Sequence, residues 1–192
     1  MKNRIGQSGF TLVELMIVVA VLGILAAIGT TLLLNYLPNM RLKSASRDVF
    51  SILMQAKVEA LRRGANVTVL FNPPLAPYAP ADARIPLESY VMFLDNGAGG
   101  GVANDEIVNG TEIILQTATA LPVRVTFDPA ISGTGLSFAH NAVVFTPRGI
   151  PINAFNGGLG SGTIGLRTVD ALGNTVRQRT ITVSSAGRIS MN

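Results

Sequence analysis

The sequence predicts an α+β fold in which one long N-terminal helix packs against a mainly antiparallel, β-rich C-terminal head. Residues 10–34 are almost entirely apolar, and residues 35–64 repeat apolar side chains at three- and four-residue steps. Residues 65–192 instead alternate in short segments that are separated by Gly, Pro and Asn. Because these β-type segments follow one another without intervening helical patterns, their sheets should be mainly antiparallel.

The apolar run of residues 10–34 contains a single charged residue, Glu14. A helix rises about 1.5 Å per residue, so this run would span roughly 38 Å, enough to cross a bilayer. A carboxylate is costly in lipid, and Glu14 therefore needs a functional reason. A short leader with two basic residues, Lys2 and Arg4, precedes the run.

Residues 35–64 are predicted to continue the helix in amphipathic form. Pro38 lacks a backbone N–H and is expected to kink or interrupt it. Gly64 follows a basic last turn, which is typical of a helix C-cap. The opposite face is rich in Lys and Arg, whereas the apolar face is formed by Leu42, Ala45, Val49, Ile52, Leu53, Ala56, Ala60 and Leu61.

Further along the chain, short segments have the alternation and the composition of strands. Asn72, Pro73 and Pro74 end the first of them, and residues 75–86, with three more prolines, are typical of a loop. The predicted strands are residues 67–71, 90–94, 112–115, 123–127, 142–145, 163–167 and 174–184.

Composition limits the classes of function. The 192 residues leave enough chain beyond the helix for one compact domain. The absence of cysteine excludes disulfides and thiol chemistry, and a single histidine, His140, excludes a His-based metal cluster. Both ends of the chain are basic and the middle is acidic, so the overall pI near 10.0 is not by itself evidence for nucleic-acid binding.

The segment GFTLVE at residues 9–14, with its basic leader, resembles the class III signal of type IV prepilins and type II secretion pseudopilins. The resemblance implies that a prepilin peptidase/methyltransferase cuts between Gly9 and Phe10 and N-methylates the new amine of Phe10. It also implies that Glu14 pairs with the N-terminal amine of a neighbouring subunit. The alternative for Glu14 is a side chain that snorkels to the lipid headgroups.

A Sec-type signal peptide is the competing interpretation of the N-terminus. Lys2 and Arg4 would form its basic region, and cleavage near Ala26 and Ala27 would discard the apolar segment. Glu14 inside the apolar region and an apolar run that continues beyond Ala27 weigh against this interpretation.

Three segments of the head resemble the GspH/FimT group of minor pseudopilins and minor pilins. They are the VFTPRG segment of residues 144–149, the closing strand of residues 177–183 with its Gly-Arg ending at residues 187–188, and the acidic Gly-rich hairpin of residues 93–106. The resemblance implies a type IV pilin-like fold, although many relatives have a proline earlier in the helix than Pro38. It divides the chain into a cytoplasmic leader (1–9), a transmembrane and assembly helix (10–34), its amphipathic continuation (35–64) and a periplasmic head (65–192).

The function implied by the resemblance is structural rather than enzymatic. The chain would be a GspH-like minor pseudopilin of the type II secretion system, anchored in the bacterial inner membrane with a cytoplasmic N-terminus and later part of the pseudopilus. Its partners would be the peptidase, other pilins or pseudopilins, and the membrane; no cofactor is expected. The alternative is a FimT/FimU-like minor pilin of a type IV pilus that acts in DNA binding and uptake.

Two weaker candidate sites lie in the head. Arg177, Arg179 and Arg188 could contact DNA phosphates, but solvated strand faces are the simpler interpretation, and the second arginine of the relatives' Gly-Arg-x-Arg is missing here. Asp95, Asp105 and Glu106 carry oxygen ligands suited to Ca²⁺. Their spacing does not match an EF-hand, so no metal is expected.

Two motifs that suggest chemistry have the wrong context. Residues 160–165 match Gly-x-Gly-x-x-Gly, but no helical pattern follows, so dinucleotide binding is not expected. Ser137 and Asp128 lie near His140 in sequence, but no nucleophile elbow is present, and no catalytic residue is predicted.

Overall fold

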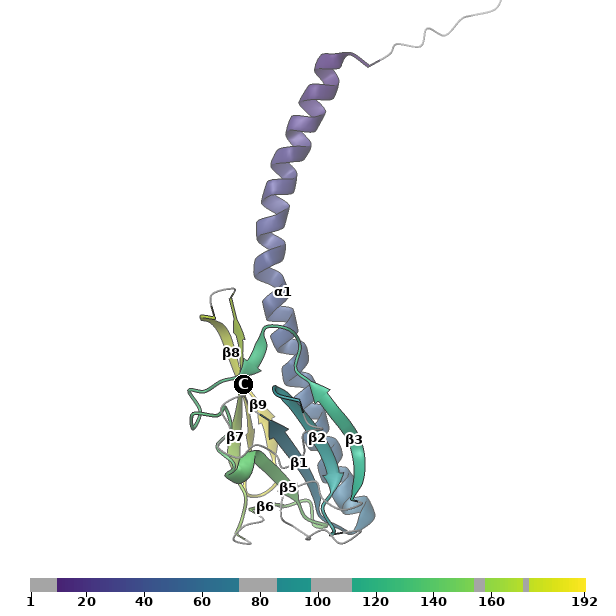
Figure 1. The fold of residues 1–192 in the computed structure, drawn as a ribbon, viewed down its shortest axis with the longest axis vertical. Coiled ribbons are helices and arrows are strands. Elements are labelled where there is room, and N and C mark those ends of the chain that lie inside the picture. Colours follow the sequence, from purple (N-terminus) through teal and green to yellow (C-terminus); the bar gives the residue numbers. More distant parts are fainter. Residues whose placement is uncertain (1–9, 73–85, 98–111, 154–157, 171–172) are drawn as a thin grey trace, which may run out of the picture. The chain divides into compact units, whose positions relative to one another are not determined.

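The computed structural model describes residues 10–72, 86–97, 112–153, 158–170 and 173–192 (Figure 1). Contacts between residues divide the chain into two compact units, Met1–Leu37 and Pro38–Asn192. The first unit holds the apolar part of helix α1 (Leu12–Arg63), and the second holds the rest of that helix together with all the described strands.

Helix α1 runs from Leu12 to Arg63 as one element, as the sequence predicts, so Pro38 does not interrupt the helix. A proline removes one backbone hydrogen bond and leaves the others in place. Helical residues continue on both sides of Pro38, and the part that follows is held by burial against the sheets. The lost hydrogen bond is therefore not enough to end the helix.

The second half of α1 buries the apolar face that the sequence predicts. Leu42, Val49, Ile52 and Leu53 are at most 1% exposed, as are the three alanines of this face, Ala45, Ala56 and Ala60. Leu61 is wrong in that list, because it is 51% exposed. It follows the buried Ala60 by one residue, which turns its side chain about 100° away from the core.

The helix ends at a glycine C-cap, as the sequence predicts. Gly64 has φ +64° and its N–H donates to the carbonyl of Ala60 at 3.0 Å, which satisfies one of the last open carbonyls of α1.

The first sheet has five strands in the order β3-β2-β1-β5-β6, and all of its pairs are antiparallel. Strand β1 lies at its centre and is completely buried. The bounds are β1 Val67–Asn72, β2 Ser89–Leu94, β3 Ile113–Ala120, β5 Ala142–Phe145 and β6 Pro151–Ile152.

The second sheet has four strands in the order β4-β7-β8-β9, again paired antiparallel. Its two long strands form a hairpin in which Leu166 lies opposite Arg179. The bounds are β4 Val125–Phe127, β7 Gly162–Val169, β8 Thr175–Val183 and β9 Ile189–Met191.

The sequence does not predict β6, β9 or the one-turn 3-10 helix η2 (Ala139–Asn141). Strands of two or three residues are too short to show an alternation. Strand β3 extends to Ala120 instead of ending at residue 115, and β4 begins at Val125 instead of residue 123. The later start of β4 has a backbone cause, because Arg124 has φ 68°, which is not a strand conformation.

The core of the second unit lies between α1 and the two sheets (Figure 1). Phe71 of β1 meets Phe127 of β4 edge to face, with ring centroids 5.9 Å apart, and so joins the sheets. The ring centroid of Tyr90, on the neighbouring strand β2, lies 6.1 Å from that of Phe71. Leu42 and Leu53 of α1 belong to the same buried cluster, so this part of the helix is built into the head.

Candidate processing and assembly site

Helix α1 begins with a capping box formed by Thr11 and Glu14. The backbone N–H and the hydroxyl of Thr11 both donate to Oε2 of Glu14 at 3.0 Å, and the backbone N–H of Glu14 donates to the hydroxyl of Thr11 at 3.3 Å. These bonds satisfy donors that the first turn of a helix leaves open. The Thr-x-x-Glu spacing in the sequence is typical of a capping box, but the charge of Glu14 by itself does not indicate one.

The capping box also leaves one oxygen of Glu14 available. Oε2 accepts both bonds from Thr11, whereas no residue in the described part of the chain donates to Oε1. An ionised carboxylate accepts hydrogen bonds on both oxygens. Glu14 can therefore hold the first turn of the helix and still bind a donor from another molecule.

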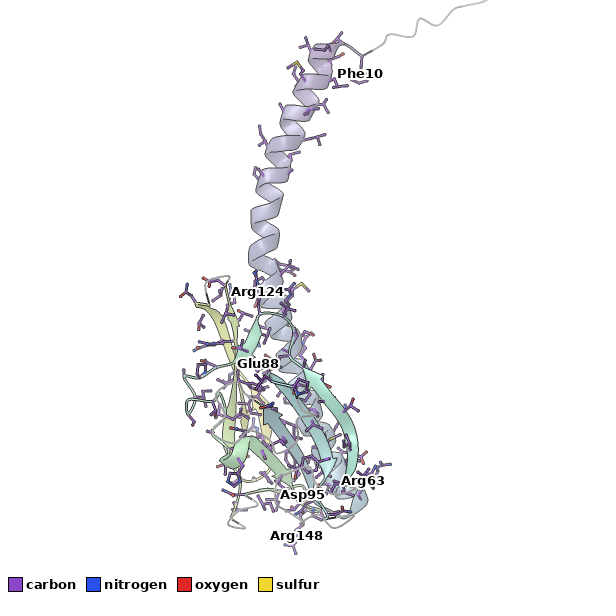
Figure 2. All side chains as sticks on the ribbon, in the orientation of Figure 1. Phe10, Arg63, Glu88, Asp95, Arg124 and Arg148 are labelled. Atoms are coloured by element: carbon purple, nitrogen blue, oxygen red, sulfur yellow. The ribbon has the colours of Figure 1, made fainter. Side chains whose placement is uncertain are left out.

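Phe10 lies directly before this box, outside the helix, and its side chain is 82% exposed (Figure 2). Gly9 falls outside the described residues, so the structure places one side of the predicted cleavage point. Nothing in the described part of the chain shields Phe10 from an enzyme.

The apolar part of α1 is not covered by other described residues of the chain. The window Leu12–Gly29 has a mean hydropathy of 2.7, and none of it is buried. By length and composition this helix could cross a membrane. A helix that is apolar all round needs lipid or other helices around it.

The two glycine motifs of the head meet in space. Gly149 closes the turn between β5 and β6, where its N–H donates to the backbone carbonyl of Thr146 at 2.8 Å. Gly187 closes the turn between β8 and β9, and a Cβ on it would lie 2.3 Å from the carbonyl oxygen of Gly149. From α1, Nζ of Lys57 donates to the carbonyl of Gly187 at 2.9 Å. Residues 144–149 and 187–188 therefore meet beside the helix, and this contact is called the glycine junction.

The structure brings together two of the three candidate DNA-contacting arginines. Arg177 and Arg179 lie two residues apart on β8 and line a groove of about 360 Å³ with Asn39 and Leu42 of α1. Arg188 lies beyond the far end of β8, directly after Gly187 in the glycine junction.

Asp95 is the one calcium candidate that the structure describes, because Asp105 and Glu106 fall outside the described residues. It is 1% exposed, and one oxygen of its carboxylate accepts a hydrogen bond from the hydroxyl of Thr68 at 3.2 Å. Among the described residues, no group of three or more His, Asp or Glu side chains is placed to hold a metal ion.

The sequence gives no signal for Glu88, which links three segments of the head. Its N–H donates to Asn72 at 2.7 Å, its carbonyl accepts from Leu121 at 2.8 Å, and its carboxylate accepts from the N–H of Phe127 at 3.0 Å. It has φ 55° and lines a cavity of about 240 Å³ with Arg167. Burial raises the pKa of Glu88 to about 7, although the bond from Phe127 and the charge of Arg167 oppose this shift.

The remaining motifs have structural roles. Residues 160–165 lead into strand β7 rather than a helix. The hydroxyl of Ser137 accepts from the N–H of Thr163 at 2.7 Å, and the carboxylate of Asp128 accepts from the N–H of Ala130 at 3.1 Å. Ser137 therefore joins the segment before η2 to strand β7, and Asp128 holds the turn that follows β4.

Two family profiles match the chain. The profile described as "Type II transport protein GspH" matches residues 45–187, and the profile described as "Prokaryotic N-terminal methylation motif" matches residues 4–30. No curated protein matches the chain.

The solved structures that align with the chain come from two kinds of assembly. The minor pseudopilin EpsH of the Vibrio cholerae type 2 secretion system aligns with a TM-score of 0.50 at 12% identity, over 79% of this chain and 96% of EpsH. The Pseudomonas aeruginosa type IV minor pilin FimU aligns in two crystal forms with TM-scores of 0.47 and 0.49, at 16% and 14% identity. Those alignments cover 79% and 82% of this chain and 92% of FimU.

The likeness to EpsH bears on the fold, and it confirms the predicted pilin-like α+β architecture of a long N-terminal helix with an antiparallel β-rich head. The GspH profile extends from the buried face of α1 at Ala45 to the glycine junction at Gly187. By this match the chain belongs to the GspH family of type II transport proteins.

Proposed function

We propose that this protein is a minor pseudopilin of the type II secretion pseudopilus, and that it acts as a structural subunit rather than an enzyme. The main supporting observation is that one chain combines an exposed apolar helix with a GspH-type head. The first turn of this helix holds the carboxylate of Glu14 by hydrogen bonds from Thr11. Residues 1–9 would be a cytoplasmic leader and residues 10–34 the inner-membrane segment. Residues 35–64 would continue the helix, and residues 65–192 would lie in the periplasm.

Processing by the prepilin peptidase/methyltransferase would free and methylate the amine of Phe10. The N-methylation motif over residues 4–30 and the exposed position of Phe10 ahead of the helix support this step. Intact-mass spectrometry of protein from membranes should show a mature chain that begins with N-methylated Phe10. A mature N-terminus at any other residue would contradict the proposal.

Assembly would join Oε1 of Glu14 to the Phe10 amine of a neighbouring subunit. When apolar helices pack together, both the amine and the carboxylate lose water, and each compensates the buried charge of the other. Removing one partner of such a pair costs about 3–5 kcal/mol. The bonds from Thr11 to Oε2 hold the carboxylate in place for this contact.

Two variants separate this pairing from helix capping. Glu14→Gln keeps an oxygen that can cap the helix but loses the charge, whereas Thr11→Val loses the capping hydroxyl and keeps the charge. We expect both to be processed. Recovery of Glu14→Gln in sheared fibres should fall by about a hundredfold or more, and that of Thr11→Val by much less, since a lost cap costs about 1 kcal/mol. Normal incorporation of Glu14→Gln would rule out the charge pairing.

A minor pilin of a type IV pilus that acts in DNA uptake is the second candidate. The neighbouring positions of Arg177 and Arg179 on β8 favour it. A deletion strain distinguishes the two assignments. Loss of protein secretion with intact pili supports the pseudopilin, whereas loss of pili or DNA uptake with normal secretion supports the minor pilin.

A further inference from the structure

Four arginines gather at the end of the head where its helical segment begins. Arg177 and Arg179 line the groove of about 360 Å³ beside Asn39 of α1. Nη1 of Arg41 donates to the carbonyl of Val123 at 3.5 Å, and Arg124 follows that carbonyl directly. Figure 2 shows Arg124 at this end of the head and Arg148 at the opposite end. The basic collar is defined as Arg41, Arg124, Arg177 and Arg179.

Within the described residues, no ion pair compensates the positive charge of the basic collar. Among the described residues, ion pairs join Glu59 to Arg62 and Arg63, and no carboxylate pairs with an arginine of the basic collar. Alternation along β8 places Arg177 and Arg179 on the same face as the buried Ile181. Their guanidinium groups therefore face the groove beside α1 rather than the outer face of the sheet.

Apolar side chains stand out from the surface at the same end of the head. Val123, next to Arg124, is 75% exposed. Val176 precedes Arg177 on β8 and points to the other face of that strand, and it is 52% exposed. Exposed apolar side chains beside uncompensated arginines suit the interface of an anionic membrane, where the arginines meet phosphate and the apolar groups meet acyl chains.

The chain itself keeps this end of the head close to any membrane that α1 crosses. The proposed membrane segment of residues 10–34 ends five residues before the groove residue Asn39. Five residues span at most roughly 18 Å even when fully extended, and about 8 Å when helical. In either case the basic collar stays within reach of the headgroups.

We propose that the basic collar binds the phosphates of anionic phospholipid headgroups and docks the head on the membrane before assembly. This inference rests on the membrane anchoring that the proposed function assumes. Guanidinium groups bind phosphate oxygens through paired hydrogen bonds. Extraction of the subunit into a fibre would then have to break these contacts, so the membrane surface would hold the head until helix packing replaces them.

The test uses the full chain in nanodiscs made of phosphatidylcholine alone or mixed with phosphatidylglycerol. Because the sequence has no cysteine, Val176→Cys provides a single site for an environment-sensitive dye. We expect a blue shift of its emission in the anionic discs, and its reversal at about 1 M salt, where charges are screened within about 3 Å. A dye on Arg148→Cys, at the opposite end of the head, should not respond to the lipid.

Matched charge variants assign the effect. In the Val176→Cys background, the pair Arg177→Gln and Arg179→Gln should abolish the shift, whereas Arg148→Gln with Arg188→Gln removes the same charge elsewhere and should leave it intact. Thermal unfolding at an unchanged temperature shows that the variant with Arg177→Gln and Arg179→Gln is folded. If that variant does not fold, Arg124→Gln replaces it as the test, and should reduce the shift.

Three outcomes would overturn the proposal. Equal emission in both kinds of disc, from protein that co-purifies with both kinds of disc, contradicts docking and leaves the anchoring intact. Failure of the protein to co-purify with either kind of disc contradicts the anchoring and the docking together. Absence of the shift, combined with DNA binding that Arg177→Gln and Arg179→Gln abolish, would assign the groove to nucleic acid instead.

Discussion

Among single residues, Glu88 should make the stability of the head depend on pH. Its pKa of about 7 lies above the usual value of 4.5, so the folded head binds this proton more tightly than the unfolded chain does. The free energy of unfolding should therefore be highest below about pH 4.5 and fall as the pH rises to about 7. Glu88→Gln should remove this decline, because an amide does not titrate and can still accept from the N–H of Phe127.

Thermal unfolding of the detergent-solubilised protein between about pH 5 and about pH 8 measures this dependence. Glu59→Gln is the matched control, since hydrogen bonds from Arg62 and Arg63 lower the pKa of Glu59 rather than raise it. The control should keep the decline. An equally steep decline in Glu88→Gln would show that another group causes it.

At Gly187, the addition of one Cβ atom should strongly lower the stability of the head. Gly187→Ala would place a Cβ 2.3 Å from the carbonyl oxygen of Gly149, at a residue with φ +76°. Gly173→Ala shares the backbone strain, with φ +84°, but meets nothing within 4 Å. We expect a cost of about 1–2 kcal/mol for Gly173→Ala and about 1–3 kcal/mol more for Gly187→Ala. Equal losses in urea unfolding would contradict the tight junction.

At the scale of elements, two leucines of α1 should differ strongly in the cost of truncation. Leu53 is 0% exposed, so Leu53→Ala should lower the free energy of unfolding by about 2–5 kcal/mol. Leu61 lies on the outer face at 51% exposure, and Leu61→Ala should change it by less than about 0.5 kcal/mol. Chemical denaturation measures both. A large loss in Leu61→Ala would mean that the helix packs on a different face.

The same elements show how far sequence reasoning reaches. Long periodic segments such as α1 and β7 were predictable, because burial of one face imposes a period on the sequence. Pro38 does not end α1, because packing of the following turns outweighs one lost hydrogen bond. Strand β6 was not predictable, since its two residues gain their partners from β5 and not from a pattern of their own.

The candidate sites divide in the same way. The capping box of Thr11 and Glu14 lies within one turn and could be read from spacing alone. Glu88 could not, because its cavity is made with Phe127 and Arg167, which come from distant strands of the other sheet. The groove beside Arg177 likewise exists only after β8 is placed against α1.

For the whole molecule, the helix and the sheets of the second unit should be inseparable, whereas the apolar segment should be dispensable for folding. Leu42, Val49, Ile52 and Leu53 of α1 complete the core that both sheets share. A fragment of residues 38–192 should therefore be soluble and unfold like the head of the full chain. A fragment of residues 65–192 lacks that face and should expose the sheets, bind a hydrophobic dye and lose cooperative unfolding. Circular dichroism and denaturation of the two fragments provide the measurement. A cooperatively folded 65–192 fragment would show that α1 only rests on the head, and the helix could then shift against it during assembly instead of carrying it as a fixed block.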